Sequence, residues 1–107
     1  KRLRAARRPP LAAWAANLLR RSRPEEAERF LELGQALREA YTGLDAGGMK
    51  ELSAQRRRLV GQLSRQAAGL AREAGHPLSD AVQRDVETTL DAVLTDPEAA
   101  DAWATGR

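Results

Sequence analysis

Arginine supplies most of the chemistry that the side chains of this sequence could perform. Sixteen of the 18 basic residues are arginine, and a guanidinium group binds phosphate or carboxylate through paired hydrogen bonds. Other reactive groups are scarce, because cysteine is absent and the single histidine, His76, precedes Pro77 in a stretch typical of a loop. The sequence also lacks a Ser-His-Asp arrangement, a phosphate-binding glycine loop and a helical carboxylate–histidine motif. It therefore predicts a protein that is not an enzyme and holds no metal or cofactor.

The charged residues are sorted by segment along the chain. The net charge is +8 over residues 1–23, −4 over 24–49, +5 over 50–72 and −6 over 73–107, which together give the overall +3. A helix with an ordinary solvated face more often mixes both signs in pairs three or four residues apart. The sorting therefore predicts separate acidic and basic surfaces.

The basic segments favour an interaction with the backbone of a nucleic acid. On a helix expected at about 48–74, five basic residues fall on the side opposite the apolar ones, namely Lys50, Arg57, Arg58, Arg65 and Arg72. They recur about every seven positions, roughly 10 Å apart, so the row can touch phosphates but cannot enter a groove to read bases. The candidate nucleic-acid-binding residues are Arg4, Arg7, Arg8, Arg20, Arg21, Arg57, Arg58, Arg65 and Arg72.

A second function stays open, that of a protein-interaction or self-assembly module. The helix expected at about 23–42 has an acidic side opposite Phe30 and Leu37, and this side could meet the basic side of the long helix in another copy. Arg56 falls within the apolar stripe of the long helix. It is either a side chain that extends to water at the bundle end or an interface residue paired with an acid of a neighbouring subunit. The candidate interface residues are Glu25, Glu28, Glu32, Glu39 and Arg56.

The two functions are favoured by different segments. The absence of any acid in residues 1–23 favours a nucleic acid, whereas the excess of negative charge in residues 73–107 opposes it. The sequence does not distinguish DNA from RNA, and it does not define the oligomeric state.

Many residues typical of helix starts and helix ends, together with a near absence of strand signals, predict an all-α protein. Ser22 and Glu25 have the spacing of a capping box, and Ser79 stands where an N-cap is expected. Gly75 and Pro77 are typical of a helix end. The expected helices cover about 11–21, 23–42, 48–74 and 80–95, with a short last helix after Asp96 and Pro97. Because the connections are short, we expect an antiparallel helical bundle of four or five helices with a long central helix.

The chain is expected to form a single helical domain over residues 1–107. Residues 1–10 are a basic stub, predicted to be the end of a truncated helix. Helical periodicity predicts a core that contains Phe30, Leu37, Leu52, Leu59, Leu63, Val86 and Leu90. Trp14 and Trp103 are interpreted as core anchors rather than as platforms for stacked bases.

The segment "LAREAGHPLSDAVQRDVE", residues 70–87, resembles a lac-repressor-type helix-turn-helix. Its turn is one residue longer than in that family and contains Pro77. The second helix carries four acids that phosphates would repel, namely Asp80, Asp85, Glu87 and Asp91. We therefore predict an ordinary corner between two helices, in which Gly75 and Ser79 serve as caps.

Four stretches together resemble a family of uncharacterised helical proteins of actinobacteria along nearly the whole chain. They are "RAARRPPLAAWAANLLRR", "LELGQALREA", "QRRRLVGQL" and "LSDAVQRDVETTLDAVLTDPEAADA". The resemblance implies a helical fold and a cytoplasmic bacterial setting, and it carries over no functional residue. The longest apolar run, residues 11–19, has about half of the roughly 20 residues that a membrane-spanning helix needs, so no membrane partner is expected.

Overall fold

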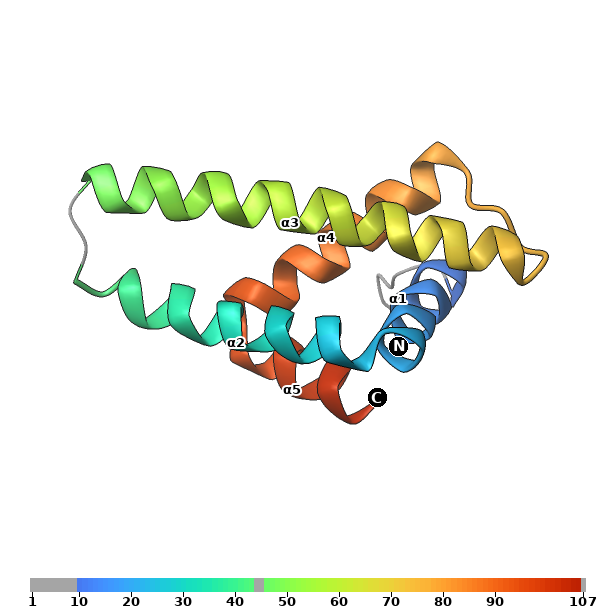
Figure 1. Ribbon diagram of the computed structural model, residues 1–107, viewed down its shortest axis with the longest axis horizontal. Coiled ribbons are helices and arrows are strands. Elements are labelled where there is room, and N and C mark those ends of the chain that lie inside the picture. The colour runs from blue at the N-terminus through green and yellow to red at the C-terminus, as the bar shows by residue number, and fades with distance from the viewer. Residues whose placement is uncertain (1–9, 44–45, 107) are drawn as a thin grey trace, which may run out of the picture.

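The computed structural model describes residues 10–43 and 46–106, which form helices and short connections (Figure 1). The helices are α1 (Pro10–Ser22), α2 (Pro24–Ala40), α3 (Ala46–Glu73), α4 (Asp80–Thr95) and α5 (Pro97–Thr105). No strand occurs in these two ranges, and α3, with 28 residues, is the longest element. The predicted all-α bundle with a long central helix is therefore confirmed. Apart from Pro10, the basic stub lies outside the described residues.

The start of α2 differs from the predicted capping box. Ser22 is the last residue of α1, so it cannot cap the next helix. The N-cap of α2 is Arg23, whose side chain makes no capping hydrogen bond. Pro24 follows it and begins the helix without an N–H group that needs a partner. The single residue between α1 and α2 thus leaves no room for the predicted box.

The segment that resembles a helix-turn-helix forms a corner between α3 and α4. Gly75 has a φ of 91°, which lets the chain turn after α3. Ser79 caps α4, since its Oγ accepts a hydrogen bond from the backbone N–H of Val82 at 3.2 Å. The side of α4 that carries Val86 and Leu90 is completely buried. The predicted caps at Gly75 and Ser79 are therefore in place, and α4 is a core helix of the bundle.

The helix α4 is the element around which the others are arranged. It packs against α1, α2, α3 and α5, whereas α2 and α3 show no comparable packing against each other within the described residues. In Figure 1, α2 and α3 run as two antiparallel arms in front of α4 and α5, and α4 crosses behind both arms. The short connection between α2 and α3 makes these arms antiparallel, as expected from the sequence, but both arms pack mainly on α4.

A close approach fixes α2 on the C-terminal end of α4. A Cβ atom on Gly34 would lie 3.1 Å from the Cα of Leu94, so only glycine permits this spacing without a shift. One turn later, Nη1 of Arg38 donates hydrogen bonds to the backbone oxygens of Leu94 at 3.0 Å and Val93 at 3.4 Å. These carbonyls lie at the end of α4, where helical backbone oxygens lack partners within the helix.

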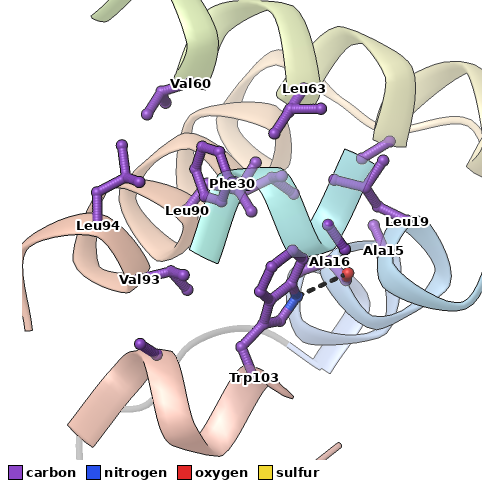
Figure 2. Close-up of a cluster of buried hydrophobic side chains, with 14 of the residues drawn as sticks. Ala15, Ala16, Leu19, Phe30, Val60, Leu63, Leu90, Val93, Leu94 and Trp103 are labelled. Carbon is purple, nitrogen blue, oxygen red and sulfur yellow. Dashed lines mark hydrogen bonds between the residues drawn. The ribbon is translucent and has the colours of Figure 1, made fainter. Parts of the chain in front are cut away.

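The core receives side chains from all five helices, including Val60 and Leu63 of α3 (Figure 2). Trp103 of α5 is 4% exposed, and its Nε1 donates a hydrogen bond to the backbone oxygen of Ala16 at 3.0 Å. Its ring packs edge-on against Phe30, with ring centroids 5.8 Å apart. Trp14 is partly buried against the core, and its ring meets His76 edge-on at 5.3 Å. Trp103 is the core anchor that the sequence predicted, and Trp14 packs at the core's edge.

The buried side of α3 is rotated away from the predicted stripe. Five residues of α3 are buried, namely Val60, Leu63, Ser64, Ala67 and Ala71. Most of them are small, which lets α1 and α4 pack closely against α3. Leu52 and Leu59, which were predicted to be core residues, are only partly buried. The other predicted core residues are buried as expected, namely Phe30, Leu37, Leu63, Val86 and Leu90.

Candidate interaction face

The basic residues that the sequence singled out lie at different places. Arg21, Arg57, Arg58, Arg65 and Arg72 are exposed. Arg4, Arg7 and Arg8 lie outside the described residues. The acidic candidates Glu25, Glu28, Glu32 and Glu39 are all exposed on α2.

Arg20 is held within the fold rather than presented to a ligand. Arg20 is partly buried, and its Nε atom is buried without a hydrogen-bond partner among the described residues. Its guanidinium lies beside Gly106, since a Cβ atom there would meet Nη2 at 3.1 Å. Gly106 is the C-cap of α5, where the helix dipole favours a positive charge. Arg20 is thus placed to stabilise the end of α5, and we leave it out of the candidate surface.

Arg56 also has its partners within the chain. Its Nη1 donates a hydrogen bond to the hydroxyl of Tyr41 at 3.1 Å, and its Nε lies 3.1 Å from Oδ1 of Asp91. The Nε contact is an ion pair whose geometry falls short of a hydrogen bond. Because the Asp91 side chain is 46% exposed, this pair adds little stability. The acid that pairs with Arg56 is therefore in its own subunit, and Arg56 serves to tie α3 to α2 and α4.

Two rows of charge with the same spacing lie on α2 and α3. The acidic row is Glu25, Glu32 and Glu39, and the basic row is Arg58, Arg65 and Arg72. Successive members of each row are seven residues apart, which is roughly 10 Å along a helix. All six residues are exposed, and no ion pair joins the rows within the described ranges. Each row lies opposite the buried side of its helix, away from α4.

A groove of about 290 Å³ runs between the two rows. It is lined by Glu26, Arg29 and Phe30 of α2 and by Leu59, Gln62, Leu63 and Gln66 of α3. We call it the α2–α3 groove. Arg29 stands four residues after Glu25 and three before Glu32, so the wall residue neighbours the acidic row. Gln62 has the same relation to Arg58 and Arg65, so the basic row borders the opposite wall.

The floor of the α2–α3 groove is apolar. Phe30 and Leu63 are buried there, and Leu59 is partly buried between them and solvent. Leu52 and Leu70 stand seven residues before and eleven after Leu59, on the same side of α3, and they are partly buried as well. The leucine side of α3 is therefore turned toward the groove, while the small-residue side enters the core.

Two acceptor atoms in the groove have no donor. Oε1 of Glu26 and Oε1 of Gln66 are buried without a hydrogen-bond partner among the described residues. Both residues line the groove, one on each wall. A buried acceptor without a donor costs about 1–3 kcal/mol. A ligand that brought an N–H donor to this level of the groove would remove that cost.

The boundary between α3 and α4 holds carboxylates as well as a basic residue. Arg57 lines a hollow between α3 and α4 together with Glu87 and Asp91. Arg57 thus borders the same hollow as two carboxylates of its own chain. We define the candidate interaction face as the α2–α3 groove with the acidic and basic rows, and we leave Arg57 out of it.

The groove walls were not identified from the sequence. The equal seven-residue spacing of both rows is visible in the sequence, but the half-exposure of Leu59 and the unpaired oxygen of Gln66 depend on the rotation of α3.

Within the described ranges, no group of three or more His, Cys, Asp or Glu residues could hold a metal ion. No helix of that part of the chain is both long and apolar enough to span a bilayer.

Comparisons with known proteins found no matching family model, no matching curated protein and no matching solved structure. The resemblance to helical proteins of actinobacteria, and the cytoplasmic setting that it implies, therefore stay predictions.

Proposed function

We propose that the protein is a non-enzymatic helical interaction module, which binds a polypeptide partner through the candidate interaction face. The observation that supports this proposal is the α2–α3 groove, which has an apolar floor, polar walls, and rows of carboxylates beside one wall and guanidinium groups beside the other. An amphipathic helix can lay its apolar stripe in such a groove. Basic residues on one side of that stripe and acidic residues on the other then complement both rows.

Binding to the backbone of DNA or RNA is the second candidate function. It is supported by the basic row, whose three arginines are exposed and make no ion pair within the described part of the chain. The arrangement around the row opposes it. The acidic row borders the same groove, and Glu87 and Asp91 lie beyond Arg57 on the other flank. Carboxylates that share a face with arginines lower its positive potential and so weaken its attraction for phosphates.

A designed peptide tests the interaction module. The probe is a helical peptide of about 20 residues with a leucine stripe, lysines along one flank and glutamates along the other. The control peptide has the same stripe with glutamates on both flanks. We expect the probe to shift the NMR signals of Leu59 and Gln62 and the control to shift them at least tenfold less at equal concentration.

A parallel measurement tests the second candidate. Fluorescence anisotropy of a labelled DNA duplex is followed at about 50 and about 200 mM salt. Strong salt-dependent binding to DNA, without binding of the designed peptide, would overturn the proposal in favour of a nucleic-acid partner. A flat signal at both salt concentrations removes the nucleic-acid candidate for duplex DNA.

A further inference from the structure

We propose that the partner is a second copy of this chain, which packs its own α2–α3 groove face to face against the first. This inference rests on the proposed function and specifies its partner. It begins from the symmetry of the face. A surface that binds itself across a twofold axis must be self-complementary, and this face has one acidic edge, one basic edge and an apolar centre.

Only one orientation of the twofold axis brings opposite charges together. An axis across the arms would place α2 over α2 of the second copy, and the two acidic rows would repel each other. An axis along the groove places α2 of each copy over α3 of the other. Because α2 and α3 run antiparallel (Figure 1), the facing helices of the two copies are antiparallel as well. The result is a four-helix arrangement of the kind found in bundles.

Two members of each row also match in position along the groove, whereas Glu39 lies level with Glu51 and Arg72 lies level with a point before the start of α2. The α2 lining spans residues 26–30 and the α3 lining spans residues 59–66, so the centre of the groove is near residues 28 and 62. Glu32 is four residues past this centre on α2, and Arg58 is four residues before it on α3. Glu25 is three residues before the centre, and Arg65 is three residues after it. Since an axis along the groove keeps every residue at its level, Glu32 faces Arg58 and Glu25 faces Arg65 of the second copy.

The centre of the face gains contacts in the same arrangement. Leu59 of the two copies meet across the axis, which removes partly exposed apolar surface from water. Arg29 lines the groove about one residue from its centre, and Glu26 and Gln66 stand two and four residues from the centre in the other direction. The axis brings Arg29 of the second copy across the groove, from where its long side chain can extend along the wall and offer N–H groups to the unpaired oxygens of Glu26 and Gln66.

Charge reversal with remixing tests this arrangement. Variant one carries Arg58→Glu and Arg65→Glu, and variant two carries Glu25→Arg and Glu32→Arg. In each variant the four positions that face each other, 25, 32, 58 and 65, all carry one sign, so each variant should associate at least tenfold more weakly with itself than the unmodified chain does. An equimolar mixture should recover a 1:1 dimer, because each of these positions then faces the opposite charge. The control, Lys50→Glu with Arg57→Glu, makes the same charge change as variant one outside the face and should still dimerise.

Sedimentation velocity measures the mass of each sample up to about 500 µM, a range that covers weak transient interfaces. Circular dichroism verifies that the variants keep their helices. A monomeric unmodified chain over this range, or a mixture that stays monomeric, overturns the second-copy proposal. If the designed peptide binds in either case, the interaction module stands and its partner is another protein. If neither association nor peptide binding occurs, both proposals are overturned.

Discussion

Two sides of α2 are packed in opposite ways. Toward α4, Gly34 brings the backbones together and Arg38 donates hydrogen bonds to the last carbonyl oxygens of α4. Toward α3, a groove remains, Leu59 is only partly buried, and one oxygen each of Glu26 and Gln66 has no donor. Small residues and satisfied polar groups allow α2 and α4 to pack tightly within the chain. Between α2 and α3, by contrast, partly exposed leucines and unpaired acceptors leave a surface that a second chain could cover.

The largest effect is expected beneath the groove, where its buried floor joins the core. Phe30→Ala removes a fully buried ring that packs against Trp103, so it should lower the free energy of unfolding by about 3–5 kcal/mol. Urea denaturation followed by circular dichroism gives the value. A loss below about 1 kcal/mol would mean that the core can do without this ring.

Two glycine substitutions compare the closed contact with an open helix surface. Gly34→Val places a branched side chain against the backbone of Leu94 and should cost about 1–3 kcal/mol. Gly69→Ala adds a methyl group whose nearest neighbour is the flexible end of Arg72 at 3.9 Å. It should stabilise α3 by about 0.5–1 kcal/mol, because alanine is the better helix former. Thermal unfolding of both variants tests the contrast, which fails if the two melting temperatures move in the same direction.

A smaller effect on stability is expected in the groove. Leu59→Ala removes a partly exposed side chain and should cost the monomer about 1 kcal/mol, less than Phe30→Ala. Its effect on self-association should be larger in proportion, with at least tenfold weaker dimerisation. Denaturation at low protein concentration and sedimentation at high concentration separate the two quantities. An equally severe loss of monomer stability at Leu59 and Phe30 would show that Leu59 belongs to the core.

The smallest effect on the monomer is expected at the basic row. Arg58→Gln with Arg65→Gln should change the free energy of unfolding by less than about 0.5 kcal/mol, because both residues are exposed and unpaired within the described part of the chain. Association of the unmodified chain should weaken as salt rises from about 50 to about 500 mM, and the double variant should lose most of this dependence. An unchanged salt dependence in the variant would remove the basic row from the interface.

The sequence predicted the helices well because their ends depend on local chemistry. The N-cap at Ser79 and the glycine stop at Gly75 act within one turn of the chain, so residue type and spacing suffice to find them. The predicted capping box at Ser22 is wrong. The preceding helix continues through Ser22, and the backbone N–H of Arg23 still donates to the oxygen of Leu19, so Ser22 is not free to begin a new helix.

The rotation of α3 could not be predicted from apolar periodicity. Apolar periodicity predicted a stripe through Leu52 and Leu59, but the helix turned small residues outside that stripe, Ser64 and Ala71, toward its neighbours. Periodicity counts hydrophobic residues and does not weigh how closely two helices can approach. That closeness depends on α1 and α4, which lie far away in the sequence.

The sequence by itself determined the helical class, the ends of most helices and the two charged rows, because each follows from neighbours within a few residues. Only the tertiary structure decided that α2 and α3 pack on α4 instead of on each other, and that their groove stays open between the rows. The physical reason is competition for burial. Gly34 of α2 and the small buried residues of α3 permit the closest helix contacts, so α4 packs against them. The leucine side of α3 then remains partly exposed.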